Sequence, residues 1–543
     1  MLPATERHRV GLAWAAAVLV LAAATAPAVG VSRDEGAYFV AAESYARFWR
    51  TALGAPGQAL ALADRLYAPN HEHPGLAKGL YGLTHAVLAE GLGVASHAQG
   101  FRFGAFLFAA ALAWLLALWG RDLAGRAGSL VAPALFFLVP RHFYHAHPAA
   151  LDLPVTALWV ATAFTYRGSL ARRGEPSAYV RWSIAAGLLF GMAVSVKHNA
   201  WFLPPLLLLH WLAAEVAPHG RGTLAGRLRA VPLAFPAMLV LGPVVFLATW
   251  PWLWHDAGAR LREYLAFHLQ HVNYSWTYLG TVMREPPFPV AYPFVVTALT
   301  VPAASLAAMA GGLAQSAARL WTAARRRAGD VSISDELLLV LNALFPILLI
   351  AWPTVPHFGG VKHWLPAMPF LALLGARALT TAGRLLSPRR AGRLTAALAA
   401  LALVPAAWAV AHVHPFGTAA YNEIAGGAGG AASLGMQRQF WGDDMVAVLP
   451  ALNEHAIPAA RVWYQEASFD AVRAYQRDGR LRADLRWADG PESADVSVYH
   501  FHQEFRDKEF ATWSQFRTAR PVAGAYLDEV PLIQVYARAG VWR

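Results

Sequence analysis

The sequence predicts a mainly α-helical, polytopic membrane protein of about eleven transmembrane helices that ends in a small extracytoplasmic α/β domain. Only 14% of its 543 residues are charged, whereas soluble proteins carry about 25%. Uncharged runs such as 11–30 and 230–254 are long enough to cross roughly 30 Å of hydrocarbon. From residue 412 onward the composition becomes polar. These observations place a membrane domain in 1–411 and an outer domain in 412–543.

Hydrophobic patterning places the individual spans. The first span resembles a signal peptide with a cleavage site at Ala26-Pro27-Ala28, but its apolar run is long for a signal core, so we expect it to be retained. The predicted spans are 11–30, 102–120, 127–140, 150–166, 180–196, 200–217, 231–250, 290–312, 336–352, 364–381 and 394–411.

Arginine-rich connectors alternate with longer polar segments. The connectors "RDLAGR", "YRGSLARRGE", "HGRGTLAGRLR", "RLWTAARRR" and "GRLLSPRRAGR" share one side with the Arg-bearing N-terminus. By the positive-inside rule that side is cytoplasmic. The segments 31–100, 251–289 and 412–543 then lie outside, in a multi-pass protein of the plasma membrane, the inner membrane of a bacterium. The net charge of +12 therefore reflects membrane orientation and not nucleic-acid binding.

The outer domain has its own pattern. The runs "ARVWYQ", "DVSVYHFH" and "LIQVYARA" are strand-like, and "FDAVRAYQRDG" is helix-like. The chain has no cysteine, which excludes disulfides, thiolate metal sites and cysteine nucleophiles. It also lacks a P-loop, a dinucleotide fingerprint and an HExxH motif, so neither a nucleotide-driven pump nor a standard zinc protease is supported.

An acidic pair stands where the first span leaves the membrane. Asp34 and Glu35 follow Ser32, and Ser32-x-x-Glu35 fits a capping box at a helix start. The structural interpretation is a capped helix whose acids suit the helix dipole. The functional interpretation is a catalytic pair with a general base at the membrane surface. Because the capping box assigns Glu35 to Ser32, we expect Asp34 to be the base and Glu35 to support the site geometry.

Two histidines and a lysine follow in "NHEHPGLAKG". His71 and His73 are two residues apart, and Pro74 disfavours helix at His73. Both histidines are candidate substrate contacts, and a metal site would need a third ligand. Lys78 is a candidate contact for the donor phosphate. Alternatively, it is a lysine whose ammonium reaches the lipid headgroups.

Another group of ionisable residues, "PRHFYHAHPAALDLP", precedes a predicted span. Arg141 is a candidate phosphate contact and His145 a candidate substrate contact. Asp152 opens the span, where it can cap the helix with Pro154 in the first turn. A carboxylate at the edge of a span should face a polar cavity or pair with a cation. Asp152 is therefore a candidate catalytic residue as well as a candidate cap.

Lys-His pairs occur at the outer ends of two spans. "SVKHNAW" contains Lys197, and "GGVKHWLPAMP" contains Lys362 and His363. A single pair is an ordinary interfacial anchor. Two pairs and Arg141 on one face indicate convergence on an anion, for which phosphate is the natural candidate. We therefore expect Lys197, Lys362 and His363 to contact a donor phosphate.

An outward cavity with a carboxylate on one wall and cations on another suits displacement of a phosphate leaving group by a hydroxyl. Nucleotide sugars are largely cytoplasmic, so an outward site implies a lipid-linked donor. The aromatic outer segment 251–289 is expected to cover this cavity. Its Trp276 and Tyr278 are candidate contacts for the sugar or the acceptor, with interfacial anchoring as the alternative role of the segment's aromatic residues.

Seven sequence elements follow one another along the chain: "DEGAYF", "HEHPGLAK", "HPAALDLPVTALW", "VKHNAWFLPP", "WPWLWHD…YLAFHLQH", "VKHWLPAMPFLAL" and "YNEIAGGAGGA…QFWGDD". In this order they resemble glycosyltransferase family 39 of the GT-C superfamily, which includes protein O-mannosyltransferases and aminoarabinose transferases. Gly75 stands where that family has a second proline, and the large C-terminal domains of the eukaryotic enzymes have no counterpart, so their protein acceptor is not implied.

The resemblance implies that Asp34 is the catalytic acid of the first outer loop and that Asp152 has a role shared by the family. It also implies phosphate contacts from Lys78 and the Lys362-His363 pair. The donor would be a polyprenyl-phosphate monosaccharide, attacked with inversion in contact with the lipid bilayer. The acceptor would be a glycan, a lipid or a protein. No cofactor is implied, because a divalent metal occurs in some GT-C enzymes but is generally not required in this branch.

Two other classes of protein compete with a transferase. A transporter or flippase of lipid-linked sugars also needs charged residues in its cavity, but it should show broken spans in two corresponding halves. A nonenzymatic scaffold would use the outer domain to bind a polysaccharide. Long outer segments with acids at the exit of the first span favour the enzyme.

The predicted topology has a cytoplasmic N-terminus and an external C-terminus, because the arginine-rich connectors share the N-terminal side. A reporter that is active only outside the cytoplasm, fused after Arg543, should therefore be active. Activity of a cytoplasm-specific reporter at the same position would contradict this topology.

Overall fold

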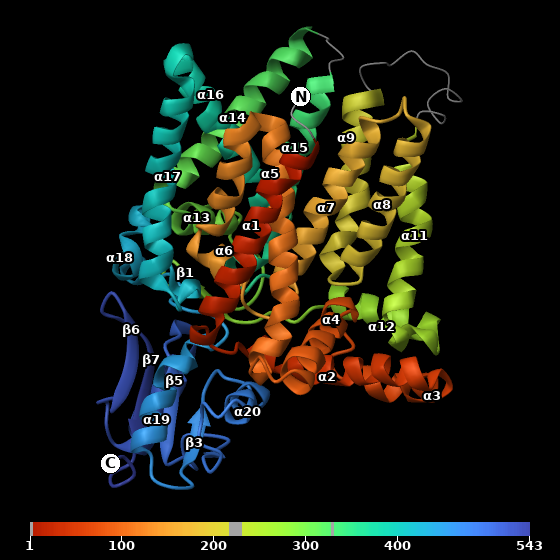
Figure 1. Ribbon diagram of the computed structural model, residues 1–543. Coiled ribbons are helices and arrows are strands. Elements are labelled where there is room, and N and C mark those ends of the chain that lie inside the picture. The colour runs from red at the N-terminus through yellow and green to blue at the C-terminus, as the bar shows by residue number, and fades with distance from the viewer. Residues whose placement is uncertain (1–3, 217–230, 327–330) are drawn as a thin grey trace.

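The computed structural model describes residues 4–216, 231–326 and 331–543. Most helices run between two opposite ends of the molecule, and a β-sheet with short helices lies at one end (Figure 1). The N-terminal helix begins at the end of the molecule opposite the sheet, and the C-terminus lies at the sheet end (Figure 1). The prediction of a mainly α fold with a small C-terminal α/β unit is confirmed. The predicted connector 219–229 lies outside the described residues.

Helices occupy every predicted span. Spans 102–120 and 127–140 form one helical element that reverses near Gly125, whose φ of +66° suits glycine, and the backbones of Gly120 and Gly128 meet across the turn. Span 290–312 is divided where Pro302 lacks a backbone N–H. The helices are α1 (Ala4–Thr25), α5 (His97–Phe137), α7 (Asp152–Leu170), α8 (Pro176–Val194), α9 (Leu203–Trp211), α11 (Ala234–Thr249), α13 (Tyr292–Thr300), α14 (Ala303–Arg326), α15 (Val331–Ile350), α16 (Met368–Leu386) and α17 (Ala391–Val413).

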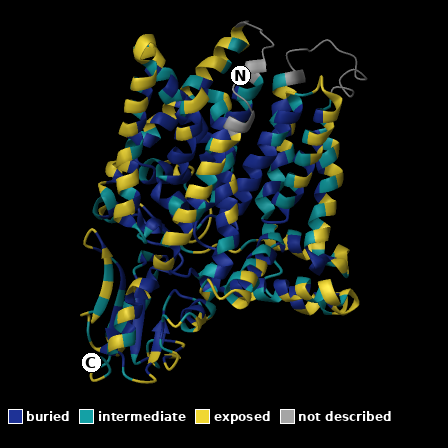
Figure 2. Ribbon diagram, viewed as in Figure 1, coloured by how far each residue is buried: buried dark blue, intermediate teal, exposed yellow. Residues whose placement is uncertain are grey.

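Apolar side chains on the outside of the bundle identify the surface that faces lipid. Five described helical segments are long and apolar enough to cross a membrane, among them α5, α8 and α16. Figure 2 shows buried residues in the centre of the bundle and exposed ones on its outer helices. On α17, Val404 and Trp408 are 66% and 73% exposed, which is costly in water and favourable in hydrocarbon. The chain is therefore a multi-pass membrane protein.

Short helices cover the sheet end of the bundle. Helices α2 (Arg33–Gly54), α3 (Pro56–Tyr67) and α4 (Leu76–His85) come from the first outer segment. They meet α12 (Ala257–Leu269) of the second, where Arg260 Nη1 donates to Asp64 Oδ1 at 2.6 Å. A small hairpin of β1 (Trp276–Tyr278) and β2 (Thr281–Met283) follows α12. The two outer segments thus form one layer (Figure 1).

The C-terminal unit is a mixed five-stranded sheet in the order β4-β3-β5-β7-β6. Its first three strands are parallel, and β7 is antiparallel to β5 and β6. All residues of the central β5 are buried, as expected for a strand covered on both faces. The predicted strands and helix are confirmed. The elements are β3 (Arg461–Tyr464), β4 (Arg486–Trp487), β5 (Val496–His500), β6 (Ala523–Leu527), β7 (Val530–Ala537), α19 (Leu449–His455), α20 (Phe469–Arg477) and α21 (Arg506–Phe516).

Helix α20 attaches the sheet unit to the membrane part. Just after it, Asp478 accepts hydrogen bonds from the backbone N–H of His97 at 2.6 Å and of Ala98 at 3.2 Å. A carboxylate that satisfies free N–H groups at a helix start stabilises that helix. The Tyr475 hydroxyl accepts from the Val31 N–H at 2.6 Å. The C-terminal unit therefore stabilises both α5 and the chain that leads into α2.

A buried ion pair fixes the first turn of α2. Glu35 and Arg102 are 0% and 1% exposed, and both nitrogens of the Arg102 fork reach Glu35 oxygens, at 2.7 and 2.8 Å. Arg102 also donates to the carbonyl oxygens of Ala26, Val29 and Gly30. Such bidentate pairs are strongly directional. One arginine on α5 thereby holds the end of α1, the connection and α2 together.

Removing one partner of this pair leaves a buried charge uncompensated, which costs about 3–5 kcal/mol. Arg102→Gln should therefore greatly lower the thermal unfolding midpoint of the purified protein in detergent.

The matched control is Arg50→Gln, because Arg50 pairs with Glu90 at 2.8 Å but is 60% exposed, and exposed pairs contribute only about 0–1 kcal/mol. Equal losses in the two variants would contradict the assignment.

Candidate active site

Asp34 is the acid that stays available at the start of α2. Ser32 Oγ accepts from the Glu35 N–H at 3.3 Å, and Glu35 Oε2 accepts from the Ser32 N–H at 3.2 Å, which completes the capping box. The Asp34 side chain is 37% exposed and meets Lys362 Nζ at 3.3 Å. The local hydrogen bonding thus engages Glu35 and leaves Asp34 facing a cation.

Glu35 cannot act as a base in this structure. Besides Ser32 and Arg102, its Oε1 accepts from the backbone N–H of Ala149 at 2.9 Å. Its carboxylate is fully buried and has hydrogen bonds on both oxygens. Of the two acids in the predicted catalytic pair, Glu35 therefore has the supporting role that the capping box led us to expect and is not a candidate base.

A second pair of acid and lysine lies close to the first. Asp152, the first residue of α7, accepts from Lys197 Nζ at 2.5 Å. The positive charge of Lys362 also acts on Asp152. The negative charges of Asp34 and Asp152 both act on the buried Tyr38. Both carboxylates and both lysines therefore belong to one site. Tyr38 was missed by the sequence analysis, although it stands four residues after Asp34 and so on the same face of α2.

Arg141 has a hydrogen-bonding group that the protein leaves without a partner. Its Nε donates to the Ala420 carbonyl at 3.1 Å, and its guanidinium lies 4.7 Å from the centre of the Tyr421 ring. Its Nη2 is buried and has no hydrogen-bond partner among the described residues. His145, on the same short helix α6 (Pro140–His145), packs 5.6 Å from the Trp441 ring. Arg141 therefore retains a buried N–H that can donate a hydrogen bond to an anion.

Lys362 is enclosed by aromatic rings. Its ammonium lies 4.6 Å from the centre of the Trp441 ring and 5.4 Å from that of Phe358. Cation–π contacts of this kind hold a cation in place without neutralising it. His363 also supports the adjacent turn, because its Nε2 accepts from the Gly359 N–H at 3.3 Å. With Nε2 as the acceptor, the neutral ring carries its proton on Nδ1, so the phosphate contact of His363 stays a prediction.

Lys78 lies inside the first outer segment. Its ammonium donates to Asn70 O at 2.6 Å, Asn70 Oδ1 at 2.8 Å, His73 O at 2.9 Å and the Tyr45 hydroxyl at 3.3 Å. These acceptors use all the N–H groups of a lysine. The structure therefore corrects the predicted phosphate contact, since Lys78 shapes the chain around residues 70–73.

The two histidines of that segment have different surroundings. His71 Nε2 lies 3.1 Å from Glu263 of α12, so it links the two outer segments. His73 is close to Tyr38 and His268, at ring distances of 6.2 and 5.7 Å, and its Nδ1 is buried without a hydrogen-bond partner among the described residues. The structure therefore brings His73, but not His71, to the side of α2 that carries Tyr38.

The predicted aromatic contacts of the second outer segment lie within the core. Trp276 is 0% exposed and packs 4.3 Å from Tyr292 and 4.7 Å from His357 between ring centres. Tyr278 is also buried, against the same Tyr292. Because both faces of Trp276 are covered, the structure corrects these two substrate contacts to packing residues. The neighbouring residues Asn273 to Ser275 line a pocket instead.

Two buried acids in "QFWGDD" were not identified as site residues. Burial raises the pKa of Asp443 to about 8, and the nearby charge of Glu35 adds to the effect. Burial and the charge of Asp443 also raise the pKa of Asp444, which lies 3.2 Å from His500. The Asp443 backbone touches Gly30, where a Cβ would collide with its carbonyl. These acids therefore belong to the joint between the C-terminal unit and α2.

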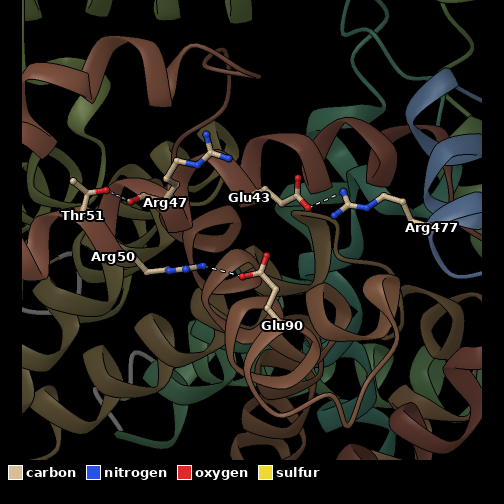
Figure 3. A pocket seen from close by; sticks show the side chains of 6 residues that line it. All are labelled: Glu43, Arg47, Arg50, Thr51, Glu90 and Arg477. Atoms are coloured by element: carbon tan, nitrogen blue, oxygen red, sulfur yellow. Dashed lines mark hydrogen bonds and ion pairs between the residues drawn. The ribbon is translucent and has the colours of Figure 1, made fainter.

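A separate cleft lies on the outer surface (Figure 3). It has a volume of about 600 Å³, and its walls carry the pairs Arg50–Glu90 and Arg477–Glu43, each at 2.8 Å. Glu43, His85 and His97 are the one group of described residues with ligand atoms close enough for a metal ion, within 4.8 Å of one another. The two imidazoles also bond to each other at 2.9 Å. Arg477 forms an ion pair with Glu43, so Glu43 and both histidines already have partners within the protein.

Comparison with known structures identifies the architecture. No family model and no curated protein matches the sequence. The crystal structure of ArnT from Cupriavidus metallidurans in the apo state matches with a TM-score of 0.51 at 14% identity, over 96% of this chain and 97% of that one. ArnT bound to undecaprenyl phosphate gives 0.50 at 14% identity, over 99% of each chain. The chain has the GT-C fold.

A larger protein shows the same fold. The apo oligosaccharyltransferase of Archaeoglobus fulgidus matches with a TM-score of 0.50 at 12% identity, over 90% of this chain and 69% of that one. The GT-C fold that the sequence elements predicted is therefore confirmed. At such identities the fold is shared while individual site residues must be argued from this chain's own geometry.

The buried acids predict a pH dependence. The folded pKa of Asp443 is about 8, above the unfolded value of about 4. The folded state therefore binds more protons at Asp443 between these values, and the contribution of Asp443 to stability falls as the pH rises through this window. Compared with the natural chain, the double variant Asp443→Asn/Asp444→Asn should lose less stability between pH 5 and pH 8, measured as the difference between their unfolding midpoints at each pH. Asp484→Asn, which replaces a side chain that is 43% exposed, should follow the natural chain. A double variant that also follows the natural chain over this range would contradict the assignment.

Proposed function

We propose that this GT-C protein is a glycosyltransferase that moves a monosaccharide from a polyprenyl-phosphate donor to a hydroxyl acceptor on the extracytoplasmic face. The observation that carries the proposal is the pairing of the partly exposed Asp34 with Lys362 at 3.3 Å, beside the Asp152–Lys197 pair and the unpartnered Nη2 of Arg141. A base and a group of cations at one place suit attack by a hydroxyl on a carbon that carries a phosphate.

The proposed reaction is a single inverting displacement. Asp34 takes the proton of the acceptor hydroxyl while that oxygen forms a bond to the anomeric carbon of the sugar. The bond from this carbon to the phosphate oxygen breaks, and its electron pair leaves with polyprenyl phosphate. Lys362, Lys197 and Arg141 stabilise the charge that grows on the phosphate. Since these cations supply the positive charge, the scheme needs no metal ion or other cofactor.

Asp152 holds Lys197 toward this site in the proposed scheme. It sits at the first turn of α7, where a carboxylate is stabilised by the helix N-terminus. Its Oδ1 accepts a hydrogen bond from Lys197 Nζ at 2.5 Å, which fixes the ammonium of a residue in the connection between α8 and α9. We assign Asp152 to positioning, and His145 to the wall of the site beside Trp441.

An apolar pocket between helices supports a lipid-linked donor. It measures about 420 Å³ and is lined by α5, α7 and α8, with Leu80 of α4 at the outer end. Its first residue on α7, Ala157, lies five residues after Asp152, which is about 7.5 Å along the helix and roughly 140° around it. Such a pocket suits an isoprenoid chain that passes around the start of α7, so that its phosphate reaches the cations. The fold neighbour bound to undecaprenyl phosphate supports the same assignment.

The proposed orientation places the sheet unit and the active site outside the bacterial inner membrane. The far ends of α7, α14 and α16 lie away from the sheet (Figure 1), and their sequences carry Arg167, Arg325 and Arg384 near those ends, as expected for cytoplasmic helix ends.

Replacing the base tests the proposal. Asp34→Asn keeps the size of the side chain but cannot take the proton, so the turnover number should fall by roughly 10²–10⁴. The measurement is sugar transfer by purified protein with its polyprenyl-phosphate donor, together with the unfolding midpoint. Asp64→Asn, an acid of the same outer layer that is 51% exposed, should leave transfer unchanged. Sugar transfer at the normal rate by a folded Asp34→Asn variant would contradict the proposed mechanism.

A further inference from the structure

A third pocket shares Phe358 and Trp441 with the surroundings of Lys362 and is built largely by the C-terminal part of the chain. Its volume is about 280 Å³, close to the lower end of the roughly 300–1,000 Å³ that is common for ligand pockets. Residues before β1 form one wall, Phe358 and Trp441 a second, and Glu466, His502 and Glu504 a third. Segments far apart in the sequence therefore meet around one small cavity.

The polar wall carries buried carboxylates. Glu504 Oε2 accepts from the Thr277 hydroxyl at 2.7 Å, and its Oε1 accepts from Gln437 Nε2 at 3.2 Å. His502 Nδ1 lies 3.0 Å from the same oxygen. Burial alone would lower the pKa of His502, but the bond to Glu504 and the charge of Glu466 raise it. This network is rigid because each of its members is held by at least one other.

Glu466 contributes an acceptor that is less occupied. Arg33 Nη1 donates to its Oε1 at 3.0 Å, and among the described residues its Oε2 has no recorded hydrogen bond. Arg33 directly precedes Asp34 in the chain. Its backbone N–H donates to the Trp441 carbonyl at 2.9 Å. The polar wall is thereby tied to the residue next to the proposed base.

The aromatic wall connects the pocket to Asp34. Phe358 and Trp441, which line the pocket, are the two rings that hold the Lys362 ammonium, and Lys362 lies 3.3 Å from Asp34. Trp441 adopts a left-handed φ of +61°, which is unfavourable for a bulky side chain and occurs mainly where surroundings enforce it. Tyr274 stands at the rim, 45% exposed, and packs 4.7 Å from Phe358 between ring centres.

We propose that this pocket binds the terminal sugar unit of a glycan acceptor and presents one of its hydroxyls to Asp34. A sugar ring has apolar C–H faces that stack on aromatic rings and hydroxyls that donate to carboxylates, which are the two chemistries that the walls supply. The inference rests on the proposed function and narrows its acceptor. A protein acceptor would need an extended groove to hold its backbone, and a lipid acceptor would need an apolar lining in place of the buried carboxylates.

The first experiment identifies the acceptor in cells. Envelope glycans, lipids and proteins are compared by mass spectrometric linkage analysis between cells that carry the natural chain and cells that carry Asp34→Asn. We expect one sugar-to-sugar linkage to disappear. Loss of a sugar from protein side chains or from a lipid headgroup would overturn the inference while leaving the proposed function intact. No difference at all would remove the proposed function itself.

The second experiment tests the pocket with purified full-length protein and the glycan fraction released from the cells' own envelope. Tyr274→Ala and Glu466→Gln should each raise the KM for this acceptor about tenfold, which corresponds to about 1.4 kcal/mol, with kcat and the donor KM within about twofold. Tyr526→Ala, a tyrosine of the sheet unit that is 48% exposed, is the matched control and should change none of them.

The kinetic pattern separates the possible occupants. A raised donor KM with an unchanged acceptor KM would mean that the pocket holds the sugar of the donor, and the inference would be wrong. Unchanged values in both variants would also overturn it. The unfolding midpoint of each variant is measured alongside, and Glu466→Gln preserves the side-chain shape, so a folding defect in one variant leaves the other to decide.

Discussion

The ion pair of Glu35 and Arg102 is the contact on which the rest of the site depends. It is fully buried, and the same guanidinium gathers three carbonyl oxygens from the turn between α1 and α2. A charge pair removed from water is tolerated only where both partners are satisfied, so the chain here has little freedom to move. The helix start that carries Asp34 is fixed as a consequence, at the boundary between the membrane part and the outer layer.

That constraint divides the work between two adjacent acids. Both carboxylate oxygens of Glu35 accept hydrogen bonds that hold the surrounding chain in place. Asp34, about 100° away around the helix, instead pairs with Lys362 at 3.3 Å. Asp152 and Lys197 repeat the pairing at a second helix end. Each acid thus holds a cation in place, and the cations remain next to a buried arginine with an unused N–H. In the proposed reaction, the donor phosphate therefore meets positive charges that are already held in place.

The C-terminal part of the chain contributes residues to the candidate site as well as supporting the helices that carry it. Its Asp478 stabilises the start of α5, which carries Arg102, and Tyr475 holds the chain before α2. Trp441 covers Lys362, and Glu466 binds the arginine beside Asp34. In the proposed function, the GT-C membrane fold therefore supplies the base and the cations, whereas the small sheet unit completes the walls of the site. Under the same proposal, differences between such units offer a physical route to different acceptors on one membrane scaffold.

The sequence by itself determined what depends on neighbours along the chain. Uncharged runs set the spans, strand-like runs marked β3, β5 and β7 but not β4 and β6, and the capping box separated Asp34 from Glu35. Tertiary structure decided which outer lysine serves the site, because Lys78 and Lys362 look alike locally. One turns into its own loop and the other meets an acid 328 residues away. It also buried Trp276, which the sequence presented as a candidate sugar contact, and Asp443, which the sequence analysis did not single out. Local hydrogen bonds act over a few residues, whereas burial and ion pairing depend on which distant segments pack together, and no local pattern encodes that.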